Sequence, residues 1–196
     1  MASDFVNDPA YINGGSEYPN NGSGLGKFQS AMQIRRGSHL NCFNSVAIGW
    51  PIGLIIDGQK GDTRMAAKDG KLKLQNVWFA DMDVTGSDAN KVYDDVLVKE
   101  FLEDGTPVLD NTQKSFSSSW FLAQPGNKSV SKADASSWFT AAGWIPTVGS
   151  PLLTAASFTD DLLQNGFDKV SYIGAFANGE VWTTGWTNFD PQNADY

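Results

Sequence analysis

The chain has few of the residues that most often build small disulfide-linked or catalytic sites: its 196 residues include one cysteine and one histidine. A single cysteine, Cys42, excludes an intrachain disulfide and is too few for a cysteine-based zinc site. Cys42 alternates with apolar residues, which predicts that it fills core space as a small hydrophobe. His39 adjoins a predicted turn and is expected on the surface. Without a second histidine or a GxSxG motif, a nucleophilic triad or a histidine metal site lacks its partners.

Membrane-spanning apolar runs and an excess of basic residues are also missing. The opening residues MASDFVNDPAYINGG contain neither a basic region nor an apolar segment, so we expect no signal peptide or membrane anchor there, and an exported protein would carry its signal upstream. Against 14 Lys and Arg stand 22 Asp and Glu, which gives a net charge of −8. This charge repels nucleic-acid phosphates and anionic lipids. We therefore expect no nucleic-acid partner and no direct membrane insertion.

Apolar and aromatic residues are abundant. Hydrophobic residues make up 41% of the chain and aromatic residues 12%, including 7 Trp and 12 Phe. A disordered chain carries fewer of these residues. A chain of this length can bury one sizeable core. The composition therefore predicts a globular protein with a single domain, in one or two lobes.

An internal repeat is the most informative pattern. The segments LNCFNSVAIGW (40–50) and LKLQNVWFADM (72–82) superimpose so that apolar residues match apolar residues and Asn44 matches Asn76. The matched residues share the parity of one face of an extended strand. Stacked strands of this kind place equivalent asparagines where they can hydrogen-bond along the stack. Two alternatives are that both asparagines are turn residues and that a two-copy match arises by chance.

Periodicity predicts the other elements. Alternating apolar residues predict a strand over 28–34, a short apolar run closed by an Asp-Gly turn predicts another over 53–57, and the polar stretch 59–70 predicts a loop. Apolar residues at intervals of three and four predict the strongest helix over 87–105. Further predicted elements are a helix over 131–143, a helix over 159–164, a strand over 170–176 and a hairpin or loop over 180–188.

Two signatures carry a family resemblance: FQSAMQIRRGSHLNCFNSVAIGWPIGLIIDG in the first half, and VSYIGAF followed by WTTGWTNFDPQN near the end. They resemble the closing rungs and the C-terminal signature of a group of uncharacterised bacterial cell-surface or secreted proteins, which are right-handed parallel β-helices. The resemblance covers residues 27–82 and 170–193. Members of the group are much longer, with many rungs upstream.

The resemblance and the repeat together predict a mainly β protein: a short right-handed parallel β-helix (solenoid) with a mixed α+β C-terminal cap. We expect residues 1–26 as a loop-rich N-terminal cover, 27–86 as the solenoid rungs and 87–196 as the cap. The resemblance implies an extracellular or outer-cell-surface location. A solenoid that begins at residue 27 has an open edge. We therefore expect self-association through this N-terminal rung, or its capping by residues 1–26 or by further rungs.

Carboxylates are the main candidates for chemistry. Asp81 and Asp83 share one strand face and could bring oxygen ligands to a calcium ion, the one cofactor that we consider. For catalysis the candidates are Asp57, Asp81, Asp83 and Arg35, because many β-helix proteins cleave acidic polysaccharides as lyases or glycosidases. A glycosidase needs two carboxylates at a defined separation, which the sequence does not supply. An arginine that enters a turn is equally typical of a charged strand end.

Two tryptophans are the candidates for ligand binding. Trp182 and Trp186 lie in a polar, threonine-rich stretch, where exposed indoles can stack on sugar rings. The alternative is core packing, which we expect for Trp78, Trp120, Trp138 and Trp144. The first functional hypothesis is an extracellular or cell-envelope binding or adhesion module for a polysaccharide or another cell-surface polymer. The alternatives are a carbohydrate-active enzyme that uses the aspartates, and a scaffold without ligand.

Overall fold

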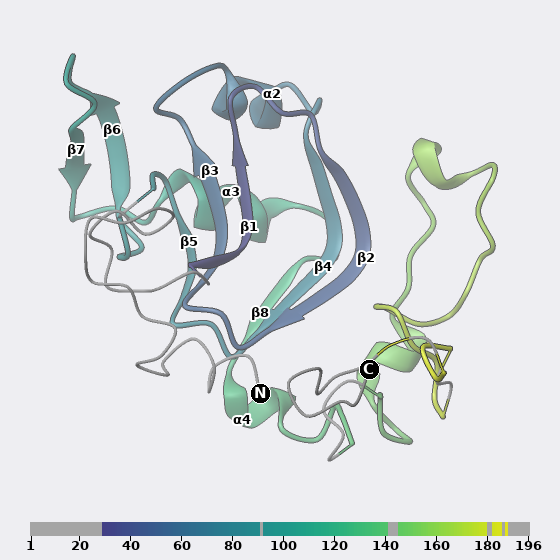
Figure 1. Ribbon diagram of the computed structural model, residues 1–196. Helices are drawn as coiled ribbons and strands as arrows, with labels where there is room; N and C mark the ends of the chain where they lie inside the picture. Colours follow the sequence, from purple (N-terminus) through teal and green to yellow (C-terminus); the bar gives the residue numbers. More distant parts are fainter. Residues whose placement is uncertain (1–28, 91, 141–144, 180–181, 186, 188–196) are drawn as a thin grey trace.

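Two small parallel sheets form the centre of the molecule (Figure 1). The computed structural model describes residues 29–90, 92–140, 145–179, 182–185 and 187. Sheet A has the strand order β1-β3-β5, with β1 (Ser30–Arg35), β3 (Ile52–Asp57) and β5 (Val84–Ser87). Sheet B has the order β2-β4-β8, with β2 (Asn41–Ile48), β4 (Lys73–Ala80) and β8 (Lys128–Val130). The chain therefore alternates between the sheets, and the predicted cover over residues 1–26 lies outside the described residues.

The internal repeat corresponds to a real strand pair. β2 and β4 are parallel neighbours in the register of the sequence match, with Cys42 opposite Leu74 and Val46 opposite Trp78. The Asn76 Nδ2 atom donates a hydrogen bond to Asn44 Oδ1 at 2.7 Å, across 32 positions of sequence. This confirms the predicted asparagine pairing and the strand character of both copies.

The prediction that each copy keeps one face is wrong, because the two asparagines bend their strands. Asn44 and Asn76 have φ values of 48° and 55°, in the left-handed region that asparagine tolerates better than most residues. Before the bend, Cys42 packs against the inner apolar cluster between the sheets; after it, Val46 and Ile48 pack against an outer cluster on the far side of sheet B. One strand thus serves two apolar clusters.

The predicted fold class is also wrong: the protein is a mixed α/β structure and not a mainly β solenoid. A solenoid needs rungs of similar length, but the paired strands are joined by very different lengths of chain, as the pairs Ser30–Ile52, Asn41–Lys73 and Trp78–Lys128 show. Helices α2 (Thr63–Lys68) and α3 (Phe116–Ala123) and an antiparallel hairpin interrupt the alternation. The residue-86 boundary falls inside β5.

The predicted helix over 87–105 is replaced by the antiparallel sheet C, formed by β6 (Leu97–Phe101) and β7 (Pro107–Asp110). A helix would use the Val98 N–H within its own backbone, whereas here it donates to the Asp88 carboxylate at 3.1 Å. Val92 and Val98 instead bury into a small cluster with Ala89. The helix-like spacing therefore reflects packing of a bent segment.

The other predicted elements are confirmed in part. Ser131 caps α4 (Lys132–Ala135), as its sequence predicts, but the helix is shorter than expected. The helix over 159–164 is the short 3-10 helix η2 (Asp161–Leu163), which follows a second one, η1 (Pro151–Thr154). No strand forms over 170–176. Helices α2 and α3 were not predicted. Of the hairpin or loop predicted over 180–188, residues 182–185 form a turn, and 180, 181, 186 and 188 lie outside the described residues.

The inner cluster is the main core and lies between the two sheets. Leu54 of sheet A and Phe79 of sheet B are completely buried in it, and Phe121 of α3 stacks on Phe79 with ring centroids 4.4 Å apart. On the other face of β4, Trp78 packs against Trp138 at 5.5 Å in the outer cluster. The expected burial of Trp78, Trp120 and Trp138 is confirmed, and Trp144 is not among the described residues.

Asp88 connects the elements that interrupt the two sheets. Its carboxylate is fully buried and accepts hydrogen bonds from the backbone N–H groups of Val98, Phe116 and Ser117 at 2.9 to 3.1 Å. The guanidinium of Arg64 lies 3.3 Å away. Negative charge is favourable at the N-terminus of a helix such as α3. Asp88 thereby ties α2, α3 and sheet C to the end of β5.

Replacing Asp88 is expected to destabilise the whole fold. Asp88→Asn removes the charge that the buried N–H donors and Arg64 require, so the free energy of unfolding should fall by about 3 kcal/mol. Denaturant unfolding followed by tryptophan fluorescence measures the change. The exposed Asp94 is the matched control, because Asp94→Asn makes the same replacement without a buried partner. Equal stability of the two variants would contradict this role of Asp88.

The asparagine pair gives a second stability prediction. Asn76 is 7% exposed and also donates to the Ala155 carbonyl oxygen at 2.7 Å. Asn76→Ala loses both bonds and leaves the left-handed backbone to a residue that tolerates it less well than asparagine, for a cost of about 3 kcal/mol. Asn76→Gly loses the same bonds without that backbone strain, so it should unfold with about 1 kcal/mol more stability than the alanine variant. Chemical unfolding of both variants tests this order, and the reverse order would refute the explanation.

Candidate functional site

Arg35 and Asp57, two of the four catalytic candidates, form an ion pair with each other. The two residues are cross-strand partners in sheet A, and Arg35 Nε lies 3.2 Å from Asp57 Oδ2. The Asp57 side chain is only 1% exposed, and its other oxygen accepts the Gln59 N–H at 2.9 Å. A carboxylate in this position is closed to a large substrate. The ion pair with Arg35 holds the carboxyl ends of β1 and β3 together.

Asp81 and Asp83 lie just after β4. Asp81 has a left-handed backbone, its N–H donates to the Val130 carbonyl oxygen at 3.1 Å, and its carboxylate lies 3.5 Å from Lys132 Nζ. Asp83 is exposed. In the described part of the chain, no three acidic, histidine or cysteine side chains gather into a group that could hold a metal ion. The calcium site at Asp81 and Asp83 stays a prediction.

Trp182, one of the two predicted ligand-binding residues, is about half exposed. Its side chain is 49% exposed, its indole Nε1 donates to the Ala175 carbonyl oxygen at 2.8 Å, and its ring stacks on Phe176 with centroids 5.6 Å apart. The indole N–H is therefore satisfied within the protein while much of the ring faces solvent. Trp186, the other predicted contact residue, lies outside the described residues.

An apolar pocket of about 260 Å³ adjoins this tryptophan. Ala175 and Phe176, the two residues that hold the indole, also line the pocket. The segment before them is fixed to β2, since the Gly174 N–H donates to the Asn44 carbonyl oxygen at 2.9 Å. The described lining residues come from β2, from the segment around the Phe139–Pro146 bridge and from the C-terminal segment: Val46, Ile48, Phe139, Pro146, Ile173, Gly174, Ala175 and Phe176.

This pocket could not be read from the sequence. Val46 and Ile48 match the pattern of a core strand, and only the bend at Asn44 turns them to the outer face. Phe139 and Ile173 look like ordinary core residues. The signal for the site in the sequence was the position of Trp182 in a polar stretch. It predicted an exposed indole but not the pocket beside it.

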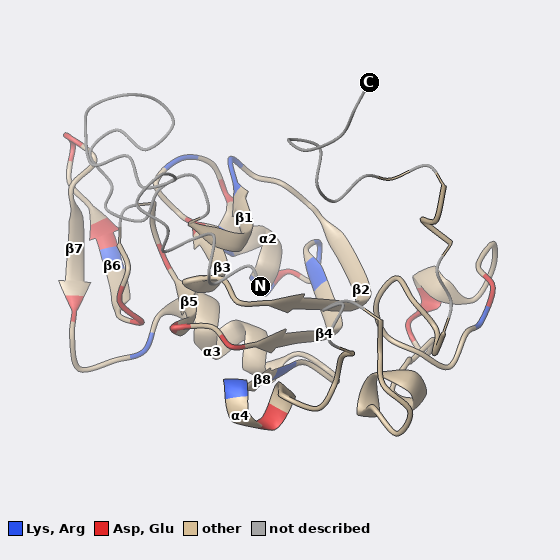
Figure 2. Cartoon of the chain, turned by 60° about the horizontal axis from the view of Figure 1, so that its bottom comes forward, with Lys and Arg blue, Asp and Glu red and all other residues tan. Residues whose placement is uncertain are grey.

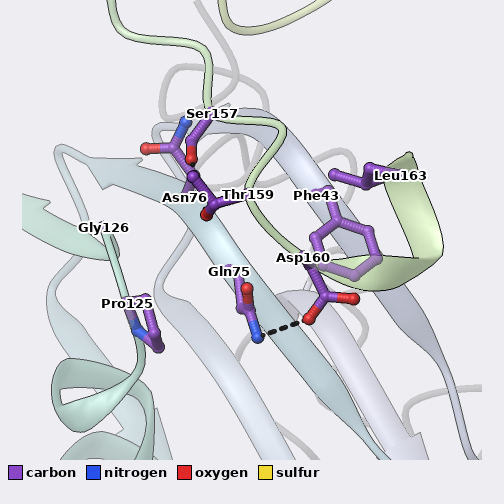
Figure 3. Close-up of a pocket in the computed structure, with 9 residues that line it drawn as sticks. All are labelled: Phe43, Gln75, Asn76, Pro125, Gly126, Ser157, Thr159, Asp160 and Leu163. Carbon is purple, nitrogen blue, oxygen red and sulfur yellow. Dashed lines mark hydrogen bonds between the residues drawn. The ribbon is translucent and has the colours of Figure 1, made fainter. Parts of the chain in front are cut away.

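A second, smaller cavity lies where the C-terminal segment crosses sheet B (Figure 3). Its volume is about 60 Å³, room for roughly two water molecules. On its wall Asp160 accepts hydrogen bonds from Lys73 Nζ at 2.8 Å and from Gln75 Nε2 at 3.1 Å. The bond from Lys73, followed by that from the Leu162 N–H, lowers the pKa of Asp160. The cavity is too small for an organic ligand, and its polar groups attach the segment to the sheet.

The Asp160 anchor predicts a pH dependence of stability. Because the folded-state pKa is lowered from 3.8, the ionised carboxylate stabilises the fold above that pH, and its contribution is lost as the pH falls through the folded-state value. Asp160→Asn should therefore be less stable than the wild type at neutral pH, and the difference should shrink on acidification below 3.8. Thermal unfolding across a pH series measures both curves. A difference that does not change with pH would contradict the prediction.

Comparison of the chain with protein-family models, curated proteins and solved structures gave no match. Among the described residues, no helix is long and apolar enough to cross a membrane. The function therefore has to be inferred from the geometry of the site.

Proposed function

We propose that the protein is a binding or adhesion module of the cell envelope or extracellular space, which takes a neutral glycan on the indole of Trp182. One observation carries the proposal: a half-exposed indole is held by a hydrogen bond and a ring stack to residues that also line an apolar pocket. Sugar rings have an apolar face that packs on aromatic rings, and a fixed ring loses little entropy on binding. The extracellular location follows from the sequence resemblance and is part of the proposal.

The charge of the chain restricts the ligand. With a net charge of −8, the protein repels polyanionic polymers, so a neutral polysaccharide suits it better than a polyuronate. The described residues that line the pocket are uncharged. The ligand is accordingly recognised through packing and backbone polar groups.

A binding module fits the geometry better than a carbohydrate-active enzyme. A glycosidase requires two accessible carboxylates on either side of the scissile bond. Asp57 is buried against Arg35, and Asp81 is paired with Lys132. No carboxylate belongs to the described lining of the pocket beside Trp182.

Affinity electrophoresis with soluble neutral polysaccharides tests the proposal, with an assay for released sugars on the same mixtures. We expect retention without product release, and a loss of retention of about tenfold in Trp182→Ala, the equivalent of 1.4 kcal/mol of ring stacking. Trp182→Phe keeps an aromatic ring and should bind with intermediate strength.

Phe167 provides the matched control. It is a second exposed aromatic residue, 58% exposed, and it does not belong to the described lining of the pocket. Phe167→Ala should bind as the wild type does. If the wild type releases sugars and Asp57→Ala or Asp81→Ala abolishes the release, the result favours an enzyme. If the protein shows neither retention nor release, the result favours a scaffold.

A further inference from the structure

The two sheets have one open end, formed by β1 and β2. Within the described residues, β1 pairs only with β3 and β2 pairs only with β4, so each has a free backbone edge. Figure 1 shows both strands at the same end of the sheets. Free strand edges carry unpaired N–H and C=O groups and are templates for pairing with another chain.

The opposite end is protected in the usual ways. Helix α3 packs against β5, so closely that a β-carbon on Gly86 would lie 2.7 Å from the Ser118 nitrogen. The other terminal strand, β8, has three residues and carries Lys128. Covering helices, short strands and lysine side chains all discourage edge pairing.

Among the described residues β2 has no covering helix and is neither short nor charged; it does bend at Asn44, whose carbonyl oxygen accepts the Gly174 N–H. The strand is eight residues long, NCFNSVAI, and contains no charged residue and no proline. Figure 2 shows β2 without acidic or basic positions, in a molecule whose net charge is −8. Electrostatic repulsion between two copies of this acidic chain is therefore weakest when they meet at the β2 edge.

Within the described residues, the main core is also open at this end. Ala31 and Met32 of β1, and Cys42 and Ala47 of β2, pack against the inner cluster but are only partly buried. Their neighbours one strand further in, such as Leu54 and Leu74, are completely buried. Covering the end would thus remove apolar surface from water in addition to pairing backbone groups.

We propose that this open end binds a second copy of the chain, with β2 of one copy paired to β2 of the other. An antiparallel ladder is symmetric about a two-fold axis, so a single strand edge is complementary to itself in that arrangement. Both free edges and the exposed core residues lie at one end of the molecule, and one partner covers them together. The proposal rests on the free strand edges and the exposed core residues and not on the glycan-binding function, although Val46 and Ile48 of β2 also line the pocket beside Trp182.

Sedimentation or light scattering over a concentration series tests the pairing. The wild type should form a species of twice the 21.2 kDa of one chain. Met32→Lys places a charge on β1, within the open end that the second copy covers, and should give monomers at concentrations where the wild type is dimeric. Met65→Lys is the matched control: it makes the same change at an exposed residue of α2, 54% exposed, and should leave the dimer intact.

Circular dichroism and thermal unfolding show whether each variant is folded. If Met32→Lys unfolds, Ser45→Lys replaces it, since Ser45 lies on β2 outside the apolar clusters. A wild-type chain that stays monomeric throughout the series overturns the proposal. A folded edge variant that dimerises as strongly as Met65→Lys overturns it too.

Discussion

The hydrogen bond between Asn44 and Asn76 is the constraint on which the rest of the structure depends. It fixes the register of β2 on β4. The left-handed backbone of both residues reverses, at matched positions of the two strands, which side chains face the core. Side chains before the bend face the core between the sheets, and Val46 and Trp78 after it face outward. Sheet B is therefore apolar on both faces. The outer face needs a cover, and the C-terminal segment provides it.

The same asparagines hold that cover in place. Asn44 exchanges hydrogen bonds with the backbone of Ser157 through its side chain, and its carbonyl oxygen accepts the Gly174 N–H. Lys73 and Asp160 add a charged contact nearby. A segment with little regular structure is thus attached by polar groups and packed by apolar ones. This attachment positions Ala175 and Phe176, and through them the indole of Trp182.

Much of the candidate site and part of the fold escaped prediction for a common reason. The spacing of apolar residues records which positions are buried, but it does not record what buries them. Residues 87–105 have a helical spacing because a bent segment and the β6–β7 hairpin bury valines at those intervals around Asp88. Asp57 looked available for catalysis until its cross-strand neighbour proved to be Arg35. The solenoid prediction extended one true strand repeat to connections that are not repeated.

The sequence by itself determined the parallel pairing of β2 with β4, its register and the asparagine contact, because two matching copies of a strand carry that information locally. It also marked Trp182 as an aromatic residue in polar surroundings. Only the tertiary structure decided that the strands turn over at the asparagines, that Asp88 gathers α2, α3 and sheet C, and that a pocket adjoins the indole. Each of these features depends on contacts between residues far apart in the chain, and a local sequence pattern carries no information about the energies of such contacts.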